Sequence, residues 1–314
     1  MGVTVKEFKV KSNDGVHTLA GVVYLPKGEV KGVYHIVHGM TEHISRYDRI
    51  MTALAENGYV CAGYDNLGHG HTVNDKTELG YIAEKRGWEL LARDVKSFAD
   101  ALRREYGSDL PYFLMGHSMG SFIVRIAAEK YVTPNKLIIM GTGGPNPAAD
   151  PGLILIEFIK LFYGGKHVSP LLYKIAFGSY NNRFNENDGS SWLTTDTEIR
   201  KKYWKDELCS FKFSVSAMGD LIRLIKYSNS KAWFKNISST MPILLVAGDQ
   251  DPVGEYGKGV MLVHQKLQKY NKDSHVILYS GARHEILNDF CYEDVKNDLL
   301  KFIDGEKENT QETR

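Results

Sequence analysis

Residues Gly116 to Gly120 read Gly-His-Ser-Met-Gly, a G-x-S-x-G pattern that can present a serine hydroxyl as a nucleophile. The apolar residues 112–115 before it are typical of a buried strand, and residues 119–127 carry apolar side chains at helical spacing. A tight strand-to-helix turn of this kind lifts Ser118 above a sheet, with Gly116 and Gly120 where a Cβ would clash with backbone. The positive end of the following helix favours negative charge there. The pattern predicts a catalytic serine; the alternative is a glycine-rich turn that happens to carry one.

A serine nucleophile needs a base, and the base needs an acid that orients it. His284 follows the apolar residues 276–279, while Asp249 and Asp251 follow the apolar residues 243–247, so both loops are expected where parallel strands end. The chain order serine, acid, histidine is the one expected with a nucleophile on this type of turn. We predict His284 as the base and Asp251 as its acid. Asp249, nearer to the strand end, is the alternative acid or a cap for the turn.

Ester hydrolysis also needs two backbone N–H donors for the oxyanion. One is expected from Met119, directly after the serine. The second is expected from Met40, which follows the predicted strand 32–37 and the pair His38-Gly39. Gly39 would let the backbone turn close to the reacting carbonyl. The alternative interpretation of His38-Gly39 is an ordinary turn at the end of a strand.

The elements that must position these residues alternate along the chain. Short apolar runs and amphipathic helical patterns follow one another through residues 32–142 and again through 243–303, which predicts an α/β fold with a mostly parallel sheet and helices on both faces. Residues 3–25 instead alternate like antiparallel edge strands. The rhythm stops at about residue 143, where loop residues and helical patterns predict an inserted unit. We expect these units: core over 1–143, a mainly helical cap over 144–229, core over 230–304, and a polar, disordered tail over 305–314.

Composition narrows the classes of function. The 314 residues hold 39 Lys and Arg against 38 Asp and Glu, a net charge of +1, which argues against nucleic acid as a partner. The sequence shows no secretory signal, no run of 18 apolar residues and no disulfide pattern among its three cysteines. We therefore expect a cytoplasmic protein without a transmembrane segment. Asp65, His69 and His71 could be imagined as metal ligands, but their sequence is more typical of a structural loop beside the active site. We predict no metal and no cofactor.

Several motifs resemble the monoacylglycerol lipases and bacterial lysophospholipases, which are serine hydrolases of the α/β-hydrolase superfamily. They are His38-Gly39-Met40-Thr41-Glu42-His43 with Arg46-Tyr47, Asp65-Asn66-Leu67-Gly68-His69-Gly70, Gly116 to Gly120, Gly248 to Asp251, and Gly281 to His284. The resemblance implies an α/β-hydrolase fold, no cofactor, and Ser118, Asp251 and His284 as the catalytic triad.

The cap resembles the bacterial members more loosely, in residues 191–196 and 208–213. Two residues depart from the family pattern. Many members have glycine in place of Ser121, which bears on helix packing after the elbow. Bacterial members often have glycine in place of Ser210, which lies in the cap and bears on the substrate.

The predicted reaction is acyl transfer to water through an acyl-enzyme, on a monoacylglycerol, a lysophospholipid or another small acyl ester. An aminopeptidase is the main alternative enzyme, since this triad also cleaves amides on the same fold. It would need acids in the cap to hold a free α-amine, although surface ion pairs are the more ordinary use of the available ones, Glu186, Asp188, Asp206 and Glu207. A non-catalytic ligand receptor is the alternative from another class, against which the intact triad argues.

The apolar residues 153–163 have two interpretations. One is a lid helix that contacts a lipid surface transiently or lines an acyl channel, and the other is an ordinary packed cap helix. The sequence defines no oligomeric state.

Overall fold

The computed structural model describes residues 2–186, 188–305 and 311–313. Within these residues one sheet has nine strands in the order β1-β2-β4-β3-β5-β6-β7-β8-β9. The pairs β1–β2 and β2–β4 are antiparallel, as expected for the opening of the chain, and every other pair is parallel. The strands are β1 Thr4–Lys11, β2 Thr18–Leu25, β3 Gly32–Val37, β4 Tyr59–Tyr64, β5 Tyr112–His117, β6 Lys136–Met140, β7 Ile243–Gly248, β8 Ser274–Tyr279 and β9 Gln311–Thr313.

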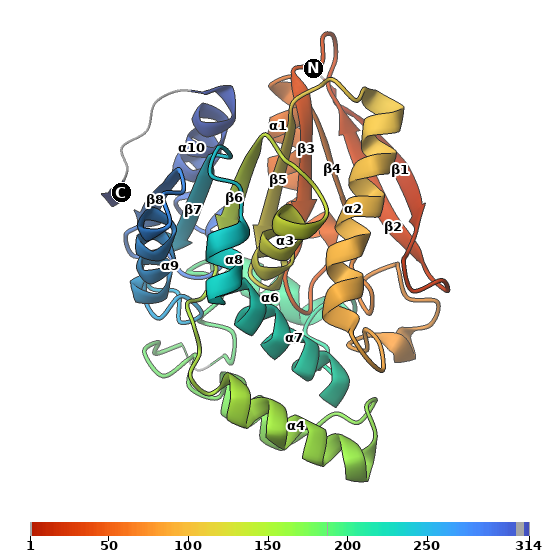
Figure 1. The fold of residues 1–314 in the computed structure, drawn as a ribbon, viewed down its shortest axis with the longest axis vertical. Helices are drawn as coiled ribbons and strands as arrows, with labels where there is room; N and C mark the ends of the chain where they lie inside the picture. The colour runs from red at the N-terminus through yellow and green to blue at the C-terminus, as the bar shows by residue number, and fades with distance from the viewer. Residues whose placement is uncertain (1, 187, 306–310, 314) are drawn as a thin grey trace.

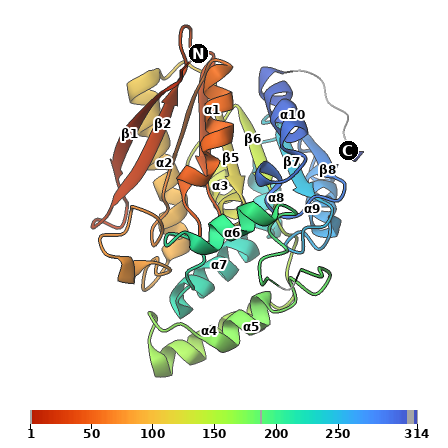
Figure 2. The same cartoon turned by 180° about the vertical axis from the view of Figure 1, so that it is seen from behind.

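Every residue of β3, β4, β5 and β7 is buried, which explains their continuous apolar sequences: a parallel strand covered on both faces has no solvent side. Helices α2, α3, α8 and α9 lie on one face of the sheet, and α1 and α10 on the other (Figures 1 and 2). The core helices are α1 Asp48–Glu56, α2 Gly87–Tyr106, α3 Met119–Lys130, α8 Lys231–Asn236, α9 Lys258–Lys269 and α10 Tyr292–Asp304, with the short 3₁₀ helices η1 Ile44–Tyr47, η2 Lys76–Glu78 and η3 Ile286–Asn288. The predicted α/β fold, with a mostly parallel sheet and helices on both faces, is confirmed.

Between β6 and α8 the chain leaves the sheet and forms four helices beyond the carboxyl ends of the parallel strands (Figure 1). They are α4 Ala149–Tyr163, α5 Pro170–Phe177, α6 Thr197–Lys205 and α7 Val215–Ser228. Helix α7 packs on α2 and α3, and α4 packs on α7. We propose that residues 144–229 are the cap.

The tail differs in part from expectation. Residues 311–313 pair with β8 as the edge strand β9, so the disorder expected for the polar tail is wrong for these three residues. The backbone groups of β8 supply hydrogen bonds that the tail's own composition does not reveal. The remainder of the tail beyond residue 305 lies outside the described residues.

Candidate active site

Ser118 lies between β5 and α3 in a strained turn. Its φ of 54° and ψ of −119° are unusual for a residue with a side chain, and its N–H donates to the carbonyl of Met140 at 2.9 Å. A Cβ on Gly116 would collide with the carbonyl of Gly120, and a Cβ on Gly120 would collide with the carbonyl of Val37. The two glycines therefore let the turn close, and Ser118 keeps part of its surface open to solvent while its neighbours are buried.

His284 and Asp251 meet at the carboxyl ends of β8 and β7. His284 Nδ1 lies 2.8 Å from Asp251 Oδ2, and the other carboxylate oxygen accepts the Val253 N–H at 2.8 Å. His284 is 2% exposed and Asp251 0%. His284 Nε2, the atom that would take the serine proton, is buried and has no hydrogen-bond partner within the described part of the chain. Hydrogen bonds to such a base often tighten only when substrate is bound.

The competing acid has a different position. Asp249 is partly exposed, and its Oδ1 accepts the N–H of Gly281 at 2.8 Å. It therefore caps the turn that leads into the His284 loop, while the carboxylate on the imidazole is that of Asp251.

His117 joins the serine turn to the histidine loop. Its ring lies 4.8 Å from the His284 ring between centroids, and its Nε2 lies 3.2 Å from the His284 carbonyl oxygen. The residue directly before Ser118 is thus in contact with the residue proposed as base.

The backbone N–H groups of Met40 and Met119 have no hydrogen-bond acceptor among the residues that the structure describes, so both remain available to a ligand. Gly39 brings the first of them to the serine. A Cβ at Gly39 would lie 3.0 Å from Ser118 Cβ and 2.6 Å from Glu42 Oε1, closer than real Cβ atoms come to an oxygen. Glycine at this position avoids both contacts, and the role expected for Met40 in the oxyanion hole stays a prediction.

Glu42 anchors this oxyanion loop, residues 38–43. Its Oε1 accepts the Gly39 N–H at 2.6 Å and the Tyr47 hydroxyl at 2.9 Å. Arg46 links it to Glu285, donating to Glu42 at 2.8 Å and to both oxygens of Glu285 at 2.7 and 2.6 Å. His117 Nδ1 lies 2.9 Å from the Tyr47 hydroxyl. One buried polar network therefore connects the oxyanion loop, the serine turn and the residue after His284.

The buried network contains charged side chains of both signs. Burial alone would raise the pKa of Glu42, but the hydrogen bond with His117 and the positive charges of Arg46 and His117 hold that pKa well below its usual range. Burial would lower the pKa of His117, yet its contact with Glu42 raises that pKa above the ordinary value. Each charge thus stabilises the charged form of its neighbour.

The loop after β4 braces the oxyanion loop from its other side. Asp65 accepts the N–H groups of Ile44 at 2.8 Å and His71 at 2.7 Å, one on each carboxylate oxygen. His38 Nε2 accepts the N–H of Asn66 at 2.9 Å. The structural role predicted for this loop is confirmed for Asp65.

The cap holds the histidine loop directly. The carbonyls of Trp192 and Leu193 accept the N–H groups of His284 at 3.3 Å and Glu285 at 2.7 Å. The Trp192 ring lies 5.0 Å from the His284 ring between centroids. Arg283 donates to the Ser191 carbonyl at 2.6 Å.

The four cap acids weighed for binding an α-amine all have cationic or histidine partners. Glu186 pairs with Arg283 at 2.7 Å, Asp188 with Arg200 at 2.5 Å, and Asp206 with His43 at 2.8 Å. Glu207 pairs with Lys76. An amine substrate would have to displace one of these partners.

Sequence reasoning assigned no role to Glu42, Arg46, Glu285, His117 and Trp192. The spacing of Glu42 and Arg46 by four residues, inside a motif already singled out, is a signal that could have indicated an ion pair. No comparable signal in the sequence joins Glu285 or Trp192 to the site, because their partners are far away along the chain.

Three comparisons place the chain among known proteins. Residues 28–290 match the family described as Serine aminopeptidase, S33 (Hydrolase_4). The chain is 31% identical to the monoglyceride lipase homolog of Monkeypox virus over 87% of this chain and 88% of that protein, and 25% identical to the monoacylglycerol lipase of Mycolicibacterium smegmatis over 94% and 98%. A thermostable carboxyl esterase from Bacillus coagulans, solved in complex with glycerol, superposes with a TM-score of 0.90 at 28% identity, covering 96% of this chain and 98% of that one.

The family match covers most of the chain, and the relatives are aligned over nearly their full lengths. The chain belongs to the Serine aminopeptidase, S33 (Hydrolase_4) family of α/β-hydrolases and is a carboxylic ester hydrolase.

Proposed function

We propose that the chain hydrolyses monoacylglycerols, lysophospholipids or related small acyl esters, with Ser118 as nucleophile, His284 as base and Asp251 as orienting acid. The observation that carries this proposal is the pairing of His284 Nδ1 with buried Asp251, which leaves Nε2 buried, unpartnered and beside the strained serine turn. A carboxylate on Nδ1 fixes the tautomer in which Nε2 can accept a proton.

The steps follow from this tautomer. His284 Nε2 takes the proton of Ser118 as the serine oxygen attacks the ester carbonyl, and the imidazolium is stabilised by Asp251. The same proton then passes to the leaving alcohol. Water, deprotonated by His284, attacks the acyl-enzyme and releases the acid.

The oxyanion formed in both steps is held by the N–H groups of Met40 and Met119. Neither group has another acceptor in the described residues, which leaves both N–H groups free to bind the developing charge. Loss of one such donor typically costs about 100- to 1000-fold in kcat.

The outer cap surface supports a lipid as the source of the ester. On α4, Ile156 and Ile159 are buried, while five other large apolar side chains are more than half exposed: Ile154, Phe158, Leu161, Phe162 and Tyr163. Leu171 and Ile175 of α5 are also exposed. These two helices form the outermost layer of the molecule (Figure 2), so this apolar face can contact a lipid surface transiently. No helix in the described ranges combines the length and apolarity needed to cross a membrane.

The relatives agree with this substrate class, since two carry the name of monoacylglycerol lipases or their homologues and the third is an esterase solved with glycerol. The aminopeptidase named by the family receives no separate support, because the cap acids are already paired.

A chain-length series of p-nitrophenyl esters, from acetyl to palmitoyl, tests the proposal beside monoacylglycerol, lysophosphatidylcholine and an aminoacyl anilide. We expect turnover of medium or long acyl chains with release of glycerol or glycerophosphocholine, abolished in Ser118→Ala. Activity confined to acetyl and butyryl esters would contradict the lipid assignment. Turnover retained by Ser118→Ala would remove Ser118 from the mechanism.

Surface contact has its own test. Phe162→Asp should reduce co-sedimentation with phosphatidylcholine vesicles and slow hydrolysis of monoacylglycerol in vesicles, while leaving a soluble short-chain ester unaffected. Val16→Asp is the matched control, because Val16 is 68% exposed but lies in the β1–β2 turn and is not part of the cap. Equal losses in both variants would refute a specific role for the cap surface.

A further inference from the structure

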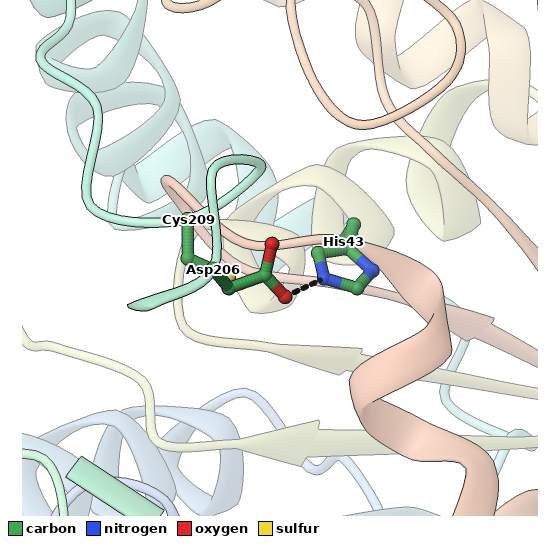
Figure 3. A group of neighbouring side chains, drawn as sticks. All are labelled: His43, Asp206 and Cys209. Carbon is green, nitrogen blue, oxygen red and sulfur yellow. Dashed lines mark hydrogen bonds and ion pairs between the residues drawn. The ribbon is translucent and has the colours of Figure 1, made fainter. Parts of the chain in front are cut away.

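Three side chains with metal-ligating atoms meet where the oxyanion loop touches the cap. His43 ends that loop, and Asp206 and Cys209 lie on the cap segment after α6. One donor atom from each residue lies within 4.8 Å of the other two. Figure 3 shows the Asp206 carboxylate directed at the His43 imidazole, where Nε2 and Oδ2 are 2.8 Å apart.

We propose that His43, Asp206 and Cys209 bind one Zn²⁺ ion. Imidazole nitrogen, thiolate sulfur and carboxylate oxygen are the donors that zinc takes in proteins. A tetrahedral zinc with bonds of about 2.0–2.3 Å holds its donors about 3.3–3.8 Å apart. His43 Nε2 and Asp206 Oδ2 are 2.8 Å apart, and all three donor atoms lie within 4.8 Å of one another, so zinc binding requires only small shifts of these side chains. A water molecule would complete the tetrahedron.

Charged groups surround the three donors. Arg46 lies between Glu42 and Glu285, and His117 contacts Glu42, so these buried charges offset one another. Burial raises the pKa of the Cys209 thiol, so a bound Zn²⁺ would have to displace the thiol proton, and the charges of Asp206 and the resulting thiolate would then offset that of the ion. His43 would bind the ion through Nε2, the atom that now contacts Asp206.

A route to the site exists. Asp206 also lines an open surface groove of about 530 Å³, formed by residues 70, 71, 73–76 and 205–208. His43 and Cys209 are 8% and 3% exposed, and the Asp206 side chain is 36% exposed. A hydrated ion can therefore reach the carboxylate from solvent and exchange its water for the two buried donors.

The proposed ion would fasten the cap to the oxyanion loop. The same two segments already touch through Ser210 N–H and the Thr41 carbonyl at 3.2 Å, and through Thr41 Oγ1 and the Tyr203 hydroxyl at 2.9 Å. Zinc would replace the existing His43–Asp206 contact with stronger bonds, only a few residues from the Met40 N–H. The site is independent of the substrate assigned above.

Titration of the chelator-treated full chain with Zn²⁺ in a calorimeter tests this inference. We expect one ion per chain, and an affinity reduced at least about 100-fold in Cys209→Ser and in Asp206→Asn, since each removes one of three ligands. Cys291→Ser is the matched control, because Cys291 is also a buried free cysteine but lies beside η3. Circular dichroism checks that each variant folds.

Co²⁺ in place of Zn²⁺ supplies a second readout. We expect a thiolate-to-cobalt charge-transfer absorption in the unaltered chain and in Cys291→Ser, and none in Cys209→Ser. Zinc binding that survives in both ligand variants, a cobalt spectrum without the thiolate band, or no binding to the unaltered chain would each overturn the proposal. None of these readouts depends on ester hydrolysis, so they are separate from any failure of the proposed reaction.

Discussion

Replacement of Asp251 by asparagine should impair the proposed base by reversing its tautomer. One oxygen of Asp251 accepts the Val253 N–H and the other faces His284 Nδ1, each at 2.8 Å. An asparagine must keep its own oxygen toward the Val253 N–H, since an amide NH₂ there would place donor against donor in a fully buried site. Its NH₂ then faces Nδ1, which must act as acceptor, so the histidine proton moves to Nε2.

A protonated Nε2 cannot accept the proton of Ser118. We therefore expect kcat to fall by about 10³- to 10⁴-fold, equivalent to about 4–5.5 kcal/mol of transition-state stabilisation, with a smaller change in KM. At high pH, hydroxide can take over part of the role of the histidine base, and only then should the loss of kcat become smaller.

Asp249→Asn is the matched control, because it makes the same chemical change two residues away. Asparagine can still accept the Gly281 N–H that Asp249 accepts, so we expect kcat to change by less than about 3-fold. Initial rates on a soluble ester, corrected for active sites by a fluorophosphonate label, compare the two variants. A larger loss in Asp249→Asn, or near-normal kcat in Asp251→Asn, would show that the orienting acid is wrongly assigned.

Three further predictions concern the network, the cap and its contact with the core. Glu42→Gln keeps the acceptor for the Gly39 N–H but loses the charge opposite Arg46. In steady-state assays kcat should therefore fall up to about 100-fold with little change in KM, and an unchanged kcat would refute a positioning role. Ser210 has a φ of 56°, so Ser210→Gly should raise the free energy of unfolding in urea by about 0.5–1 kcal/mol, whereas a decrease would contradict the strain argument. Burial raises the pKa of Asp220 to about 6, so the folded state favours the neutral carboxyl, and the free energy of unfolding of the wild type falls as pH rises through that value. Asp220→Asn does not titrate, so its free energy of unfolding relative to the wild type should increase by on the order of 2–3 kcal/mol between about pH 4 and pH 7. A difference that does not depend on pH would argue against a raised pKa.

Much of the core could be predicted because its signals are local. The strands β3, β5 and β7 are short continuous apolar runs, and each is followed by a loop that carries polar or glycine residues. The choice of Asp251 over Asp249 also came from position in the loop, and the structure places only Asp251 on the imidazole. Ser210, one of the two positions noted as departing from the family pattern, has a left-handed backbone conformation that favours glycine.

The connections between loops could not be predicted, because they depend on side chains that approach only after folding. Glu285 reaches Arg46 across 239 positions of the chain, and His43 reaches Asp206 across 163. Periodicity describes which face of an element is buried, but it carries no information on which charged group lies opposite another. The pairing of β9 with β8 is missed because backbone hydrogen bonds supplied by β8 leave no mark on the polar composition of residues 311–313.

The contacts of the cap divide it into two parts with different freedom. Residues 190–195 and 283–289 are joined by hydrogen bonds from both backbone and side-chain donors, including the N–H of the proposed base, and each contributes about 0.5–1.5 kcal/mol. Lifting this inner part would displace His284 and empty the site of its base. Among the described residues, no hydrogen bond joins α4 or α5 to residues 283–289; α4 packs on α7 and its outer face is exposed. We therefore expect any motion that admits substrate to involve α4 and α5, which also carry the apolar surface, while residues 190–195 stay fixed on the histidine loop.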